Sequence, residues 1–490
     1  MDLTVILGPP GSGKAGRAID ALRDAAARGV DAFLLVPGAV DRARFLRELA
    51  GRDDEVLVGI EVGTFDQLVA RIAGSPPVRR TDRAMERILV RDALADVPAF
   101  DRAAAWSGFV DTARAHVDEL RRARVWGGEE LLRVEAELPG EHVDAWRRLE
   151  QRVGELLDER RLRDDAWFER QAERALRRGA PGVDAVVCYG FDSFAPGRLA
   201  LLERLAGHVP VTVTLAWRPG RRVHERAADL RDRWRTAGAF VEELDAQPDV
   251  EPVLAWLGSE LFEDTSSTAP ETDRNPDTPA AVAFVDCCGP TQEAEEVVRE
   301  VAMLRARGME WDDIVVASAD AATGSELLLA AFERAGIPAR LQARRRAVDV
   351  PAGRALHELL DAIVERDELR LVGALQTPLF GVDRERVDDV ELRLRRGRHG
   401  ARRWLDDPRL VRLLPEPISE LARHAAASGP ADGDVVRLRA MLASLHPADL
   451  GELDLLRGVA ALLEGLVVAA GGDRGIGVRD LRDALAALVL

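Results

Sequence analysis

The feature that most constrains this chain is an apolar segment followed by a glycine-rich loop and a helical stretch near its start. Residues 3–7 form an apolar run typical of a buried strand, and the loop Gly8-Pro9-Pro10-Gly11-Ser12-Gly13-Lys14 follows directly. Residues 14–28 carry apolar side chains at helical spacing. Glycines in such a loop let backbone N–H groups converge on phosphate oxygens, and the helix contributes its positive end. This context favours a phosphate-binding loop over a Gly/Pro turn that merely contains a lysine.

Lys14 is the one lysine among 68 lysine and arginine residues. A compact ammonium group can reach between the β- and γ-phosphates, a task for which a planar guanidinium is poorly shaped. The next residue, Ala15, stands where the phosphate-loop pattern has the Ser or Thr that holds Mg²⁺. We therefore expect the loop to bind nucleotide, but to hold Mg²⁺ weakly if at all.

The overall composition limits the class of protein. The net charge of −17 over 490 residues argues against a wholly basic nucleic-acid binder, but not against a cleft lined locally with arginine. There is no basic leader and no long uncharged apolar run, so we predict neither a signal peptide nor a membrane span. Three cysteines are too few for a disulfide framework and favour the cytoplasm. The scattered histidines and cysteines predict no metal site.

The alternation of strands and helices predicts a parallel sheet. Strand candidates lie at 32–36, 55–62, 183–189 and 209–215, and a mainly helical stretch separates the second from the third. A proline-punctuated polar segment at 263–279 is typical of a linker. A second αβ pattern then follows, with strands at 281–285 and 314–317 and helices at 291–307 and 324–335. The predicted division is 1–245, an αβ domain with a helical insertion at about 70–178; 246–280, a helix and polar linker; 281–352, a second αβ unit; and 353–490, a helical insertion interpreted as truncated.

An acidic residue that could bind Mg²⁺ is expected at the end of strand 183–189, where this chain has Tyr189. Asp192 lies just past that strand. Two interpretations remain open for it: it approaches the metal through a water molecule, or it serves as a turn residue before the next helix.

Two groups of arginines are candidates for phosphate-backbone contacts. One includes Arg344 and Arg345, and the other includes Arg395 and Arg396, with Trp404 beside it as a candidate stacking platform. The alternative is a solvated helix face paired with the many acidic residues.

These stretches together resemble the UvrD/Rep-type DNA helicases, and most closely the AddB/RexB-like subunits of bacterial helicase–nuclease complexes. The resemblance is carried by the phosphate loop, by Thr64-Phe65 in the segment 62–68, by the segment 190–196, and by matches between 313 and 380. The family implies two RecA-like P-loop domains with parallel sheets, each carrying a mainly helical insertion. It also implies ATP as ligand, single- and double-stranded DNA as substrates, and Thr64 and Phe65 near the DNA path.

Departures from the family pattern qualify this expectation. Ala15, Tyr189 and Ala319 replace three positions that serve ATP hydrolysis in relatives. A PD-(D/E)XK nuclease needs a catalytic lysine, and Lys14 is already assigned, so we expect no nuclease centre in this chain. We therefore predict an ATP-binding, DNA-binding helicase-like subunit with impaired hydrolysis, whose partner subunit supplies the main motor. An active ATP-dependent helicase and a non-catalytic scaffold with a relic P-loop remain as alternatives.

Overall fold

The computed structural model describes residues 1–489 apart from 39–40, 43–44, 47–57, 75, 105, 124–139, 246–250, 264–267, 269–281, 319–323, 340–345, 397–403, 430–432 and 473–474. The chain divides into two compact units. Unit 1 comprises residues 1–79, 118–131 and 163–286, and unit 2 comprises residues 80–117, 132–162 and 287–490. Each unit is described by itself.

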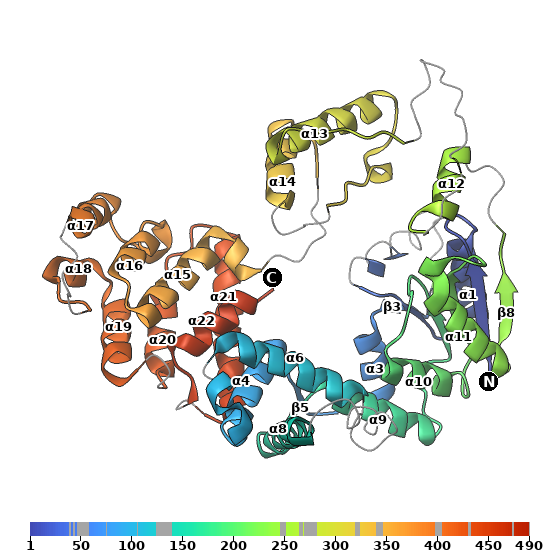
Figure 1. Ribbon diagram of the computed structural model, residues 1–490, viewed down its shortest axis with the longest axis horizontal. Coiled ribbons are helices and arrows are strands. Elements are labelled where there is room, and N and C mark those ends of the chain that lie inside the picture. The colour runs from blue at the N-terminus through green and yellow to red at the C-terminus, as the bar shows by residue number, and fades with distance from the viewer. Residues whose placement is uncertain are drawn as a thin grey trace. The chain divides into compact units, whose positions relative to one another are not determined.

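Unit 1 is built on a six-stranded parallel sheet with the order β3-β2-β6-β7-β1-β8. Figure 1 labels its two edge strands, β3 and β8. The strands are β1 (Leu3–Gly8), β2 (Ala32–Leu35), β3 (Ile60–Gly63), β6 (Ala185–Cys188), β7 (Val211–Ala216) and β8 (Phe240–Glu243). The helices are α1 (Lys14–Ala27), α3 (Phe65–Ala73), α9 (Asp165–Arg177), α10 (Pro196–Leu205), α11 (Glu225–Thr236) and α12 (Pro252–Glu260).

Apolar side chains cover the sheet on both faces, as the continuous apolar strands require. On β2, Phe33 and Leu35 join the core cluster that contains α3, α9, α10 and α11. Leu34, which points to the opposite face, packs with Leu22 of α1. The phosphate-loop helix therefore covers one face of the sheet, while four other helices contribute to the core on the other face.

The predicted parallel sheet of the first domain is confirmed. Four of the six strands overlap the candidates at 3–7, 32–36, 183–189 and 209–215, and β3 occupies the end of the candidate at 55–62. The edge strand β8 was not predicted, because its sequence, Phe-Val-Glu-Glu, is short and half polar. The predicted linker at 263–279 lies almost wholly outside the described residues.

Unit 2 is helical and has one large hydrophobic core. Both stretches predicted as separate helical insertions contribute fully buried leucines to it, including Leu89, Leu149, Leu359, Leu421 and Leu466. Its longer helices are α4 (Arg83–Leu94), α8 (Gly140–Glu159), α13 (Pro290–Ala306), α14 (Gly324–Arg334), α15 (Pro351–Glu365), α17 (Arg384–Arg396), α19 (Glu416–Ser428), α20 (Val435–Ala443), α21 (Leu450–Ala470) and α22 (Val478–Ala487). The shorter ones are α5 (Asp101–Ala104), α16 (Glu368–Ala374) and α18 (Pro408–Leu413). Helix α6 (Ser107–Ala123) and the two-stranded sheet of β4 (Arg79–Arg80) and β5 (Leu162–Arg163) include residues of both units.

The second RecA-like sheet remains a prediction. Of the candidate strands at 281–285 and 314–317, the described residues form no strand, although helices α13 and α14 form where they were expected. Phe284 and Val315 are 98% and 86% exposed. An apolar strand becomes a sheet only when a neighbouring strand accepts and donates its backbone hydrogen bonds, and the described residues provide none here.

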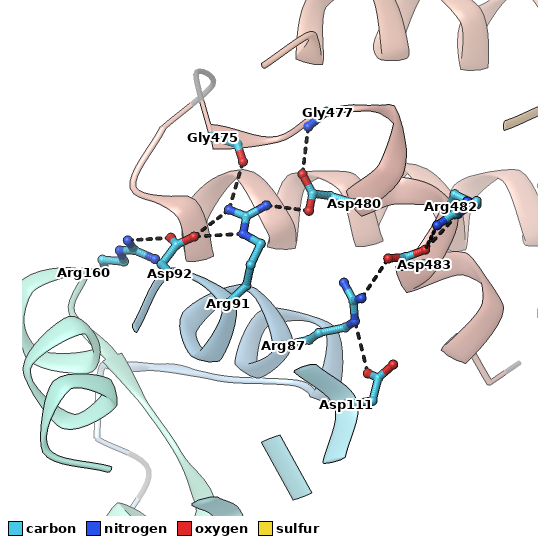
Figure 2. A network of polar contacts seen from close by, with 10 residues as sticks. All are labelled: Arg87, Arg91, Asp92, Asp111, Arg160, Gly475, Gly477, Asp480, Arg482 and Asp483. Atoms are coloured by element: carbon cyan, nitrogen blue, oxygen red, sulfur yellow. Dashed lines mark hydrogen bonds and ion pairs between the residues drawn. The ribbon is translucent and has the colours of Figure 1, made fainter. Parts of the chain in front are cut away.

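A polar network joins the N-terminal and C-terminal parts of unit 2 (Figure 2). The Arg91 guanidinium on α4 binds Asp480 on α22 and donates to the carbonyl of Gly475 at 3.1 Å. On the same helix, Arg87 pairs with Asp483 at 2.7 Å. Arg91 and Asp480 are 389 residues apart in sequence, so this network fixes a long-range contact that apolar packing alone leaves less specific.

We predict that Arg91→Ala lowers the free energy of unfolding by about 3 kcal/mol, because it leaves the buried carboxylate of Asp480 without its charged partner. The measurement is urea-induced unfolding followed by circular dichroism. The matched control is Arg457→Ala, which removes an exposed pair with Asp454 and should change stability by less than about 0.5 kcal/mol. Equal effects of the two substitutions would contradict this role of the network.

Candidate functional site

The phosphate loop lies between β1 and α1, as the sequence predicted. Gly13 precedes the helix with a φ of 85°, a left-handed conformation that favours glycine. A Cβ atom at Gly8 would lie 2.4 Å from the Ser12 Oγ and 3.1 Å from the Leu244 carbonyl oxygen, so a larger residue there would displace the Ser12 side chain and crowd the backbone. The loop is therefore held in a tight turn at the carboxyl end of a central strand.

The ammonium group of Lys14 folds back onto its own loop. Its Nζ donates to the carbonyl oxygens of Gly8 at 2.6 Å and Pro9 at 2.5 Å, and to the Ser12 Oγ at 3.3 Å. Burial lowers the pKa of Lys14 to about 8. These neutral oxygens are weaker partners for an ammonium ion than a phosphate anion would be. A phosphate entering the loop would therefore compete well for Lys14.

The loop that follows β7 forms one flank of the phosphate loop, because β1 and β7 are adjacent and parallel. The backbone N–H of Trp217 donates to the Gly8 carbonyl at 3.0 Å. Burial lowers the pKa of His224, and the positive charges of Arg221 and then Lys14 lower it further, against a backbone hydrogen bond to Arg218 that raises it. His224 thus lies in the electrostatic field of Lys14 and remains neutral over a wider pH range.

Strand β8 forms the other flank. The N–H of Leu244 donates to the Leu7 carbonyl at 2.8 Å, which extends the pairing of β8 with β1 to the start of the loop. Glu242 on β8 forms an ion pair with Arg17 on α1. This pair joins the first turn of α1 to the edge strand of the sheet.

The positions at which Mg²⁺ ligands were considered, Ala15, Tyr189 and Asp192, form no metal site among the described side chains. Ala15 places a methyl group on the first turn of α1, half-buried. Asp192 follows β6, is exposed, and accepts a hydrogen bond from the Ser193 Oγ at 3.1 Å. Tyr189 packs against Phe45 with the ring centroids 4.9 Å apart. No cluster of three or more His, Cys, Asp or Glu side chains suited to a metal occurs in the described part of the chain.

Thr64 and Phe65 lie at the start of α3. The N–H of Thr64 donates to the Gln67 Oε1 at 2.9 Å, which helps to cap the helix. The Phe65 ring is 2% exposed and lies under the Arg198 guanidinium, 4.7 Å from the ring centroid. Phe65 is thus placed to anchor α3 in the core of unit 1, and a DNA contact for this segment stays a prediction.

The arginine candidates are only partly described. Arg344 and Arg345 lie outside the described residues, as does Ala319. Arg395 is exposed on α17 and pairs with Glu391 one turn earlier, and Arg396 ends the same helix. Trp404 is partly buried against the helical core, and its Nε1 donates to the Ala422 carbonyl at 3.4 Å. This buried position leaves less of the indole face for base stacking than the sequence alone suggested.

Sequence reasoning missed Arg221, His224 and Glu263. Their proximity to the phosphate loop depends on the order of the strands, with β7 directly beside β1. The signal that was present is the position of Arg221 and His224 shortly after a predicted buried strand, because the carboxyl ends of parallel strands share one edge of the sheet.

The chain is similar to an ATP-dependent helicase/deoxyribonuclease subunit of Desulforamulus reducens, with 26% identity over 446 residues. The match covers 83% of this chain and 38% of the length of that relative. No protein-family model matches the chain. This distant similarity supports the predicted resemblance to AddB-like helicase–nuclease subunits.

Proposed function

We propose that this chain is an ATP-binding, DNA-binding subunit of a helicase–nuclease complex that processes DNA double-strand breaks. The observation that carries the proposal is the half-buried Lys14 in the glycine-rich loop between β1 and α1, whose ammonium group contacts only neutral oxygens of that loop. The similarity to a relative named as a helicase/deoxyribonuclease subunit supports the cellular role. UvrD/Rep-type ancestry, with a second RecA-like sheet completing the motor fold, belongs to the same proposal.

The proposed site holds ATP and hydrolyses it poorly. A hydroxyl and a carboxylate on Mg²⁺ are the parts on which hydrolysis depends in P-loop enzymes. Ala15 supplies neither, and Asp192 lies past the end of β6, where it is exposed and accepts a hydrogen bond from Ser193. Bound ATP would then act as a structural or regulatory ligand, while a partner subunit supplies the main motor. We also place the chain in the cytoplasm as part of this proposal. None of the helices in its described part is long and apolar enough to cross a membrane.

Affinity for ATP should fall as pH rises through 8. Lys14 has a lowered pKa of about 8 in the free protein, whereas a bound phosphate would keep it protonated. ATP binding therefore takes up a proton above pH 8, and the affinity should fall toward about tenfold per pH unit there. The measurement is isothermal titration calorimetry with ATP from pH 7.5 to 9.5, a range in which the phosphates are fully ionised.

Lys14→Ala is the companion variant in this titration. It should bind ATP about tenfold or more weakly at pH 7.5, because a charge-assisted contact is lost, and its remaining affinity should not change through pH 8. Arg23→Ala, an exposed change on the same helix, serves as the control and should match the parent chain. ATP affinity that is unchanged in Lys14→Ala would refute nucleotide binding at this loop.

Ala15→Thr tests the impairment of hydrolysis. We expect the parent chain to show DNA-stimulated ATP turnover far below that of an intact motor, and the new hydroxyl to raise turnover by about tenfold because it restores a Mg²⁺ ligand. Ala15→Val has the same shape without the hydroxyl and should give no gain. Fast turnover by the parent chain would contradict the proposal and favour an active helicase.

Arg395 and Arg396 test the DNA-binding part. Binding of single-stranded DNA should weaken with rising salt, and the double change to alanine should lower both the affinity and the salt dependence, by a slope of up to about 1.4 for two phosphate contacts. Fluorescence anisotropy at several salt concentrations measures both quantities. The double change of exposed Arg174 and Arg177 on α9 removes the same charge and should have a smaller effect. Equal effects would indicate general electrostatics, without a specific path at α17.

A further inference from the structure

The flank of the phosphate loop formed by residues 217–225 contains a buried cation in addition to Lys14. The register of β1 with β7 pairs Gly8 with Ala216, so the chain after β7 leaves the sheet beside the start of the phosphate loop. The hydrogen bond from the Trp217 N–H to the Gly8 carbonyl continues this pairing by one residue. The side chains of this segment are therefore positioned by the same strands that position Lys14.

The cation is Arg221. Its side chain keeps only 8% of its surface exposed, and its Nε lies 3.1 Å from a carboxylate oxygen of Glu263. Its Nη2 donates to the Leu261 carbonyl at 2.7 Å. Its Nε and Nη1 are both buried, and neither makes a hydrogen bond to the described residues, although Nε lies within ion-pair distance of Glu263. A buried guanidinium with an unused donor is costly, and such a donor favours an anion that can supply the missing acceptor.

Arg221 and Lys14 both act electrostatically on the same side chain, His224. His224, three residues after Arg221, is close enough to both cations for each to disfavour its protonated form. Glu263 also accepts from the backbone N–H of Arg222 at 3.2 Å, so one carboxylate holds both the side chain and the backbone of this segment. The arrangement is a pair of cations, one of them neutralised by an internal carboxylate.

We propose that Arg221 is a second phosphate-binding cation of the nucleotide site, and that Glu263 is the internal anion that occupies it until nucleotide binds. This inference rests on the proposed binding of ATP at the phosphate loop. A phosphate group offers a planar guanidinium two acceptor oxygens, and so can replace the carboxylate of Glu263 while also satisfying Nη1. Glu263 is then a competitor of the ligand, and part of the binding energy of ATP goes into displacing it.

The competing explanation is purely structural: the contacts of Arg221 with Glu263 and with the Leu261 carbonyl act as a clasp that holds the residues after α12 against the segment after β7. Substitution of either partner would then weaken the clasp in the same direction. A competitor behaves differently, because removal of its charge strengthens ligand binding. Glu263→Gln keeps the size and the acceptor oxygen of the side chain but removes the charge, so the sign of its effect on ATP affinity distinguishes the two explanations.

The experiment is calorimetric titration of the full chain with ATP, with thermal unfolding of each variant measured in parallel. Arg221→Ala should weaken ATP binding about tenfold, and Glu263→Gln should tighten it about threefold or more, as expected for the loss of a charged contact and of a charged competitor. Arg222→Ala, an exposed change of the same charge in the same segment, is the control and should leave the affinity unchanged.

The variants separate the two proposals. If Lys14→Ala leaves ATP binding intact, the proposed function fails. If Lys14→Ala abolishes binding while Glu263→Gln leaves it unchanged or weakens it, only the present inference fails. If Arg221→Ala does not fold, Glu263→Gln alone carries the test, because loss of a structural contact gives no reason for tighter ATP binding.

Discussion

The parallel pairing of β1 with β7 on one side and β8 on the other is the constraint on which the candidate site depends. It places the phosphate loop at the carboxyl end of a strand that has neighbours on both sides, with the chain after each neighbouring strand beside it. Backbone hydrogen bonds from Trp217 and Leu244 extend this pairing into the site itself. The position of Lys14 is therefore set by backbone geometry, which depends on the glycines of the loop.

How much of this could be predicted from the sequence depended on whether the signal was local. The strand, loop and helix around Lys14 were predicted because glycine positions and apolar periodicity act over a few residues. The contact of Arg221 with Glu263 could not be predicted, because it requires the strand order and the return of the chain through α12. The expected strands near Phe284 and Val315 have the right composition, but strand formation depends on partners that composition does not specify.

Unit 2 shows the same limit for helices. Periodicity identified amphipathic helices in two stretches separated by the αβ segments, but an apolar stripe does not specify which helix will cover it. Helix α4 and helix α22 meet in one core, and the ion pair of Arg91 with Asp480 selects that pairing. A buried charge pair contributes less to net stability than to the choice of partner, since each wrong pairing would leave a charge without a counterion.

The same chemistry has a different consequence beside the phosphate loop. Arg87 and Arg91 of unit 2 pair with Asp483 and Asp480, and neither has a buried nitrogen that lacks a hydrogen-bond partner. Arg221, in contrast, has buried donors without a partner, and Lys14 is held only by neutral oxygens. Both groups would gain from an anion, so the site is poised to bind phosphate even without a hydroxyl at position 15. If Glu263 competes with nucleotide as proposed, the apparent affinity for ATP would be reduced by the fraction of molecules in which Glu263 occupies Arg221. Under that proposal, the binding energy of ATP would go into breaking the contact between Arg221 and Glu263, and hydrolysis would not be needed for this change.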